Sequence, residues 1–124
     1  MRTMLRWSMP ALALVAVVVW GAFLTAADKP KYTIEEIMEQ AHDEDNGLYK
    51  KVLEDKASKE EKAKLLELYT ILGQNKPKKG DVKSWKEKTA AMIDAAKDLV
   101  ADKKDAKDRL MKAVNCIACH KLHK

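Results

Sequence analysis

Five residues near the end of the chain, Cys116-Ile117-Ala118-Cys119-His120, have types and a spacing that can do chemistry. The pattern C-x-x-C-H is the attachment signal for c-type haem. Two thiols at this spacing can add across the two vinyl groups of one porphyrin edge, and the adjacent imidazole can bind the iron. On a helix the two cysteines lie one turn apart. The spacing therefore predicts one covalently attached haem c, with Cys116 and Cys119 as attachment points and His120 as an iron ligand.

Two other chemistries use the same residue types. Cysteines at this spacing can form a disulfide or a redox-active dithiol, but a thioredoxin-like dithiol lies near a βαβ unit, and no such pattern occurs in this sequence. Structural zinc takes four protein ligands, whereas the chain has two cysteines and three histidines, and His42 is far from the motif. Haem is the favoured cofactor, and a haem-free dithiol or metal-binding protein is the alternative.

The first 27 residues have the layout of a secretory signal. Arg2 and Arg6 form a short positive region, residues 7–24 are uncharged and mostly apolar, and small residues follow at 25–27. This order is typical of a cleaved signal peptide. The apolar run of 18 residues also reaches the lower limit for a membrane-spanning helix, so a retained anchor is the alternative. In both cases we expect residues 28–124 to form one domain in the periplasm or otherwise outside the cytoplasm.

Composition favours a helical fold. The chain has 124 residues, of which 47% are hydrophobic, 35% are charged and only 6% are aromatic. A β-sandwich or barrel needs β-branched and aromatic strands separated by turn residues, and this apolar fraction is too high for a disordered chain. Without residues 1–27 the body has 97 residues and a net charge of +3. Its core is small, so a buried porphyrin would add needed stability.

Hydrophobic periodicity and capping signals predict four helices. Three of them are expected to begin at capping boxes, in which a hydroxyl and a carboxylate three residues later satisfy each other's backbone N–H groups. The boxes are Thr33/Glu36, Ser58/Glu61 and Ser84/Glu87. The first helix is interrupted at Asn46-Gly47, Gly73 is expected to end the second, and residues 74–83 form the one long loop.

The fourth helix begins near Asp105, and its apolar face is expected to continue to Ile117 and His120. Each of the four helices has one apolar face that must be buried against its neighbours. The predicted fold class is therefore all-α, a four-helix bundle of up-down-up-down topology that follows the signal peptide.

A C-x-x-C-H motif at the end of an exported four-helix chain resembles the class II cytochromes c, the group of cytochromes c′ and c556. Lys124 follows His120 by four positions, where that family usually has a basic residue, and His123 has the place of a common aromatic ring. The resemblance covers residues 33–124 by architecture and 116–124 by motif, although typical members have a longer body. It implies thioether links at both cysteines, His120 as the proximal ligand, and a sixth position that is empty in c′ or filled by a methionine of the first helix in c556.

Met38 and His42 are the candidates for this sixth position. The beginning of the first helix meets the end of the last one in an antiparallel bundle, and Met38 is at about the level of His120. His42 lies one turn further along. Alternatively, Met38 is a core packing residue and His42 is a surface residue. The sixth coordination position of the iron would then be empty. His123 is expected to be a rim residue or a hydrogen-bond partner, and Met92 and Met111 are expected to be packing residues.

These features predict an exported mono-haem c-type cytochrome that carries single electrons and is not an enzyme. A cytochrome c′-like gas-binding haem protein is the alternative that keeps the cofactor. Residues 101–124 carry a net charge of +4, and residues 33–45 contain six acids and no base. The basic face predicts docking to an acidic redox protein, or pairing with acids across the bundle. Nucleic-acid binding is not expected, because acids dilute the lysines. Contact with a membrane is expected only if residues 1–27 are retained. The sequence is compatible with a homodimer as well as a monomer.

Overall fold

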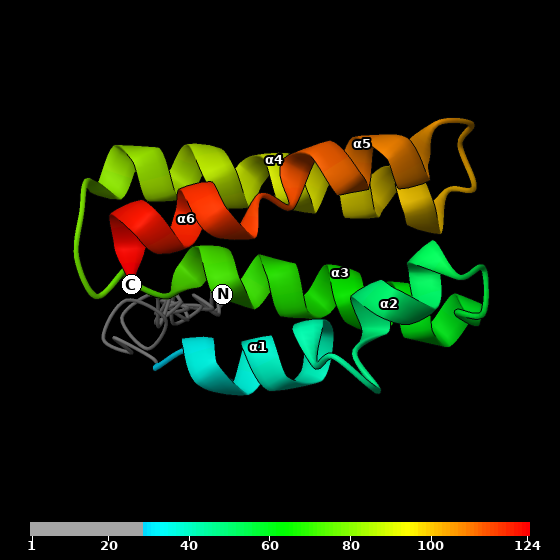
Figure 1. The fold of residues 1–124 in the computed structure, drawn as a ribbon, viewed down its shortest axis with the longest axis horizontal. Helices are drawn as coiled ribbons and strands as arrows, with labels where there is room; N and C mark the ends of the chain where they lie inside the picture. Colours follow the sequence, from blue (N-terminus) through cyan, green and yellow to red (C-terminus); the bar gives the residue numbers. More distant parts are fainter. Residues whose placement is uncertain (1–28) are drawn as a thin grey trace, which may run out of the picture.

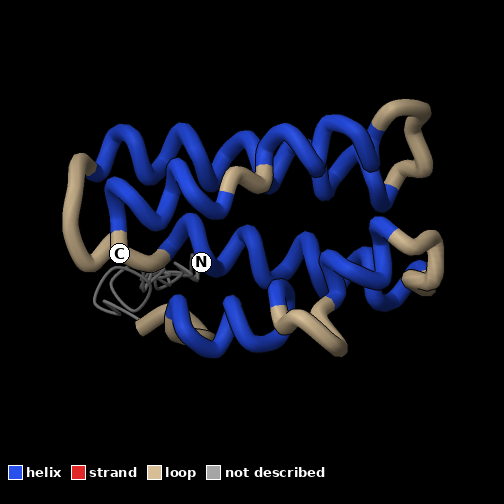
Figure 2. Tube along the Cα trace, in the orientation of Figure 1, coloured by secondary structure: helices blue, strands red, loops and turns tan. Residues whose placement is uncertain are grey.

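The structure, a computed structural model, describes residues 29–124, so the expected signal segment 1–27 lies outside the described part of the chain. Residues 29–124 are all-helical, as composition and periodicity predicted, and contain no strand (Figure 2). No helix among them has the length and apolar character needed to cross a membrane. The helices are α1 (Ile34–His42), α2 (Leu48–Leu53), α3 (Lys59–Gln74), α4 (Val82–Val100), α5 (Ala106–Ala113) and α6 (Cys116–His123).

The two longest helices, α3 and α4, run antiparallel and have the most extensive contact of any pair. Figure 1 shows that α1 and α2 follow each other along α3, and that α5 and α6 return along α4. Each of the two pairs, α1 with α2 and α5 with α6, thus consists of two short helices with a break between them. The start of α1, the end of α3, the start of α4 and the end of α6 lie at the same end of the molecule (Figure 1).

Two of the three expected capping boxes are confirmed. At the start of α1, the Thr33 hydroxyl accepts a hydrogen bond from the Glu36 N–H at 3.2 Å. The Glu36 carboxylate in turn accepts one from the Thr33 N–H at 2.7 Å. Ser58 and Glu61 form the same reciprocal pair at the start of α3. These caps determine where each helix begins, and therefore which side chains share its buried face.

The expected capping box at Ser84 and Glu87 is wrong, because α4 begins earlier. The Asp81 side chain caps the helix by accepting a hydrogen bond from the Lys83 N–H at 3.2 Å. Aspartate is as good an N-cap as serine, so the first suitable residue starts the helix. Ser84 consequently lies inside α4.

The expected helix end at Gly73 is also wrong, since α3 continues through it to Gln74. Asn75 is the C-cap, and its N–H donates to the carbonyls of Ile71 and Leu72. Gly73 instead faces α4, where a Cβ would lie 3.4 Å from the Ile93 Cδ1 atom. Residues 75–81, rather than 74–83, form the connection to α4.

The first predicted helix is interrupted near Asn46 and Gly47, as the sequence indicated. After α1 the Asp43 carboxylate accepts hydrogen bonds from the N–H groups of Asp45 and Asn46, at 2.9 and 2.8 Å. Gly47 is buried in this turn, and a Cβ there would lie 2.6 Å from the Asp43 carbonyl oxygen. The turn needs a glycine because of this close approach, and α2 begins directly after it.

The last predicted helix is divided as well, which the sequence did not indicate. Val114 and Asn115 separate α5 from α6, with ψ angles of 84° and 88° in place of helical values. The break ends the expected apolar face, because the Ile117 side chain is 82% exposed. His120 is also exposed, and it borders a cavity rather than continuing the core.

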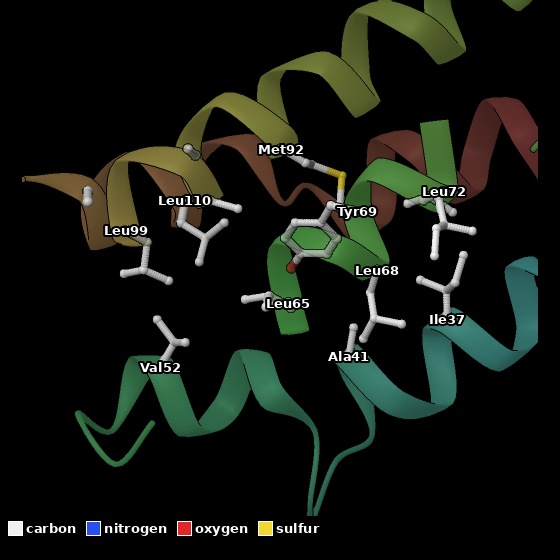
Figure 3. Close-up of a cluster of buried hydrophobic side chains, with 14 of the residues drawn as sticks. Ile37, Ala41, Val52, Leu65, Leu68, Tyr69, Leu72, Met92, Leu99 and Leu110 are labelled. Atoms are coloured by element: carbon white, nitrogen blue, oxygen red, sulfur yellow. The ribbon is translucent and has the colours of Figure 1, made fainter. Parts of the chain in front are cut away.

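The core consists of side chains from α1 to α5. Leu65, Leu68 and Tyr69 of α3 lie at its centre and are fully inaccessible to solvent. Figure 3 shows Ile37 and Ala41 of α1 on one side of them. Helix α6 contributes nothing to this apolar core except the partial packing of Cys119 against it. The helix that carries the motif is therefore held by other contacts.

Candidate functional site

A cavity of about 770 Å³ lies between α1, α4 and α6. Pockets of about 300–1,000 Å³ are typical of small-molecule and cofactor sites. All five residues that the sequence singled out line this one cavity: Cys116, Cys119, His120, Met38 and His42. Apolar side chains of other helices line it too, namely Leu72, Trp85 and Met92. The structure thus brings together residues from both ends of the domain.

Helix α6 begins at the motif because Asn115 caps it. The Asn115 side-chain oxygen accepts a hydrogen bond from the Ala118 N–H at 3.0 Å, and its backbone carbonyl accepts one from the Cys119 N–H at 3.0 Å. Cys116 and Cys119 therefore lie one helical turn apart on the same helix. Both are free thiols, and Cys116 is exposed whereas Cys119 is half-buried.

Burial raises the pKa of the Cys119 thiol above its ordinary value, with a smaller contribution from Cys116. The positive charge of Lys88 opposes this shift without cancelling it. The Cys119 sulfur is therefore protonated at neutral pH and is a weak nucleophile there.

Met38 and His42 lie one turn apart on α1, on the opposite wall from the motif. The His42 imidazole packs against two tyrosine rings, at centroid distances of 5.1 Å from Tyr49 and 5.7 Å from Tyr69. Its Nε2 atom is 3.2 Å from the Tyr69 hydroxyl oxygen, which is hydrogen-bonding distance. The ring therefore has a defined orientation. His42 is not the surface histidine that the acidic residues after it in the sequence suggested.

Burial, with a smaller electrostatic contribution from His120 across the cavity, lowers the pKa of His42 to about 4. His42 is consequently neutral at pH 7. A neutral imidazole has an unprotonated ring nitrogen, the form of histidine that binds metals. Met38 is half-buried and packs partly against the core.

The sequence gives no sign that Tyr69, on the buried face of α3, has a role at the site. The Tyr69 side chain is fully buried, and burial raises the pKa of its hydroxyl above the ordinary value. The buried hydroxyl has a partner in His42, as buried polar groups require. No local signal marks this pair.

His123 is buried and forms hydrogen bonds with Ser84 and with the Lys79 carbonyl. Of the two roles expected for it, the structure supports that of a hydrogen-bond partner. Met92 is buried in the core as predicted, but Met111 is 49% exposed, so the expectation that it packs inside is wrong. The break after α5 leaves Met111 near the end of a short helix whose buried face is Ala106 and Leu110.

Comparison with protein-family models, with curated proteins and with solved structures gives no significant match for this chain.

Charged side chains of both signs line the cavity. The acidic ones are Glu35 and Glu39 of α1 and Glu87 of α4, and the basic ones are Lys78, Lys88, Lys112 and Lys124. Lys78 forms an ion pair with Glu35. Within residues 29–124, no three His, Cys, Asp or Glu side chains gather closely enough to hold a metal ion by themselves. The cavity thus has an apolar wall, nitrogen and sulfur donors on two facing helices, and lysines with which an anionic ligand can pair.

Proposed function

We propose that this chain is an exported mono-haem c-type cytochrome that carries single electrons, similar to the class II cytochromes c. The observation that carries the proposal is the arrangement of Cys116, Cys119 and His120 on one short helix along a cavity of about 770 Å³, with Met38 and His42 on the facing helix. The haem, when bound, supplies an iron that changes its oxidation state.

The residues present fit such a group. Two unpaired thiols lie one turn apart and can carry the two covalent links. The His120 imidazole is on the same helix and borders the cavity, so it can act as the proximal ligand. Leu72, Trp85 and Met92 supply an apolar wall for a flat macrocycle, and the lysines can pair with its carboxylates.

Met38 is the first candidate for the sixth ligand. Its thioether lines the cavity from α1, whereas the Nε2 atom of His42 is already paired with the Tyr69 hydroxyl. Binding of a metal through this nitrogen would break a hydrogen bond to a buried hydroxyl, which costs about 1–3 kcal/mol. Methionine as the second axial ligand raises the reduction potential, which suits electron transfer.

Cys119 is the less reactive of the two thiols, so the chemistry of a haem-free dithiol would have to begin at the exposed Cys116. Reactive cysteines have a lowered pKa and sit in electropositive surroundings, whereas burial raises the pKa of Cys119. A thiol of this kind exchanges slowly with disulfides at neutral pH. Its half-buried position suits a sulfur that anchors a cofactor.

We further propose that the six helices correspond to a four-helix bundle of up-down-up-down topology in which the first and last helices are each broken once. The breaks lie after His42 and before Cys116. They therefore fall at the ends of α1 and α6, the helices that carry the candidate ligands. The domain would span residues 28–124, with residues 1–27 as a signal that directs it to the periplasm.

The intact mass of the exported protein tests the proposal. The full chain is expressed in a bacterial host with a haem attachment system, and the product is expected to carry the mass of one haem. The double variant C116A/C119A is expected to lose all covalent haem, because both links are removed. Ile117→Ser is the matched control within the motif, and it is expected to keep the haem since its side chain is 82% exposed. A wild-type product without haem would contradict the proposal.

Spin state then assigns the sixth ligand. Met38→Ala is expected to convert a low-spin haem into a high-spin one, while Met111→Ala, a control at a surface methionine, leaves the spectrum unchanged. Conversion by His42→Ala instead would name His42 as the ligand. A wild-type haem that is already high-spin and whose spectrum shifts with carbon monoxide would support the cytochrome c′-like gas-binding function.

A further inference from the structure

His123 is the one residue of α6 that is buried, with a residual exposure of 4%. Its sequence neighbours Leu122 and Lys124 are both exposed. A short helix that buries one side chain depends on the contacts of that side chain for its local stability. The contacts of His123 therefore decide how the end of α6 is held.

Three contacts fix the His123 ring. Its Nδ1 atom is 3.0 Å from the Lys79 carbonyl oxygen, to which it donates, and its Nε2 atom is 3.1 Å from the Ser84 hydroxyl oxygen. The edge-to-face contact with the Trp85 ring has a centroid distance of 5.5 Å and an interplanar angle of 76°. Aromatic pairs favour this geometry. Both ring nitrogens are satisfied, and the ring spans the connection before α4 and the first turns of α4.

Gly80 permits this approach. Its backbone has φ +93°, a conformation that favours glycine. A Cβ at this position would overlap the Leu122 carbonyl oxygen and would lie 2.6 Å from His123 Nδ1. The connection between α3 and α4 is therefore shaped to receive the last turn of α6.

The contact network continues beyond the histidine. The Trp85 indole N–H donates to the Asn75 carbonyl oxygen at 2.9 Å, and the Asn75 side-chain amide donates to the Tyr32 carbonyl oxygen at 3.1 Å. The last turn of α6 is thus linked to the end of α3 and to the residues just before α1. Both segments adjoin helices that line the cavity, through Leu72 of α3 and Ile34 of α1.

We infer that His123 is a positioning residue whose contacts attach the last turn of α6 to the start of α4; we call these contacts the clasp. They hold His120, which lies one turn earlier on the same helix, at its place along the cavity. The Asn115 cap fixes the other end of the helix. Between these two ends only Cys119 packs partly against the core, so the contacts of His123 are the main ones that hold the last turn of α6 at the cavity. The part of this inference that concerns haem depends on the proposed function.

Local hydrogen exchange tests the clasp without reference to haem. The full chain from the haem-attaching host is compared with His123→Ala, and exchange of the backbone amides of α6 is followed by mass spectrometry. Loss of the clasp is expected to speed their exchange about tenfold or more, since one buried hydrogen bond corresponds to about this factor. Amides at the centre of α3 are the internal reference and are expected to keep their rate.

Two variants separate the clasp from a general loss of stability. His123→Asn keeps a donor near the position of Nδ1 and is expected to recover part of the protection. Lys121→Gln changes an exposed residue of the same helix and is expected to exchange like the wild type. Unchanged α6 exchange in His123→Ala, or equal acceleration in α6 and α3, would overturn the inference.

The absorption spectrum provides the second readout. In His123→Ala a fraction of the haem is expected to lose the His120 ligand at neutral pH, and His123→Asn is expected to restore it in part. Faster α6 exchange with an unchanged haem spectrum would overturn the positioning of His120. If the wild type carries no haem, the proposed function fails, while the exchange measurement still decides whether the clasp exists.

Discussion

His42 and Tyr69 form a polar pair inside an otherwise apolar region, and both side chains are held in their neutral forms. Burial lowers the pKa of His42 to about 4 and raises the pKa of Tyr69. The hydrogen bond between them satisfies the hydroxyl and orients the imidazole. A neutral, oriented histidine beside the candidate ligand Met38 keeps positive charge away from this wall of the cavity.

The lowered pKa of His42 predicts a pH-dependent stability for the chain without haem. In the unfolded chain the imidazole takes up a proton as the pH falls through about 6.5, whereas in the folded chain it does so only near pH 4. Between these two pH values the unfolded chain binds the proton more strongly than the folded chain. The free energy of unfolding is therefore highest above pH 6.5, and it decreases as the pH falls towards 4. The full size of the His42 contribution is about 3 kcal/mol, from 1.36 kcal/mol per pKa unit.

Urea unfolding at pH 7.5 and pH 4.5 measures this contribution. Carboxylates also titrate in this range, so the wild type is compared with His42→Gln, which keeps an acceptor for the Tyr69 hydroxyl. The free energy of unfolding is expected to fall more steeply in the wild type than in the variant. Equal pH dependence in the two proteins would mean that His42 has an ordinary pKa.

At the scale of the elements, the two breaks determine where the site lies. The turn at 43–47 ends α1 directly after His42, and residues 114–115 start α6 directly before Cys116. A continuous helix in either place would carry these side chains on a different face. The first break was predictable because Asn-Gly is a strong local turn signal. The second contains no glycine or proline, and Asn115 alone caps the new helix.

Gly47 and Gly73 predict opposite effects for the same substitution. In Gly47→Ala the new Cβ would lie 2.6 and 2.7 Å from the backbone oxygen and nitrogen of Asp43, so the turn must open. We expect a loss of about 2 kcal/mol in the free energy of unfolding. In Gly73→Ala the nearest atoms are side-chain atoms of Ile93 and Thr89 at 3.4 Å, an ordinary contact. There we expect a gain of about 0.5 kcal/mol from helix propensity.

Chemical denaturation of the two glycine variants under identical conditions measures both changes in the free energy of unfolding. A Gly47→Ala protein as stable as the wild type would show that the turn is not tightly packed. Destabilisation by Gly73→Ala would show that α3 and α4 are too close at this point to accept a methyl group.

At the scale of the whole molecule, the charges on the described surface are only partly paired. Several ion pairs connect separate elements, such as Lys62 with Asp102 at 3.4 Å and Lys107 with Asp55 at 3.2 Å. These exposed pairs contribute little to stability. Among residues 29–124, Lys112, Lys121 and Lys124 take part in no ion pair. Two of them, Lys112 and Lys124, line the cavity and form the basic region that stays available for the predicted docking to an acidic redox protein, whereas Lys103, Lys107 and Arg109 pair with acids of other helices or loops.

The basic region predicts salt-dependent electron transfer in the haem-loaded protein. Oxidation of the reduced protein by anionic hexacyanoferrate(III) is expected to slow as ionic strength rises from about 0.01 M to about 1 M, where the Debye length shortens from about 30 Å to about 3 Å. The variant K112E/K124E is expected to react more slowly at low salt and to lose most of this dependence. Stopped-flow absorbance gives the rates.

The matched control K56E/K59E has the same net charge but is changed at exposed positions near the start of α3, away from the cavity. It is expected to keep most of the wild-type salt dependence, because the field near the cavity falls off with distance. Identical behaviour of the two double variants would show that net charge, and not the basic region, sets the rate.

The sequence by itself determined the features that rest on neighbouring residues. The all-helical character, the capped starts at Thr33 and Ser58 and the turn at Gly47 all follow from contacts within a few positions along the chain. The motif at 116–120 is local in the same sense. Each signal competes only with other conformations of the same short segment, so it can be identified without knowledge of the rest of the chain.

Only the tertiary structure decided what the candidate site contains. The bond between His42 and Tyr69 joins residues 27 positions apart, and the bond between Ser84 and His123 joins residues 39 positions apart. Asp81 replaced Ser84 as a cap, and this left the serine hydroxyl to bind the histidine. Such pairings depend on which helices are neighbours and on how each is rotated, because burial makes a polar group take whichever partner the packing brings within reach.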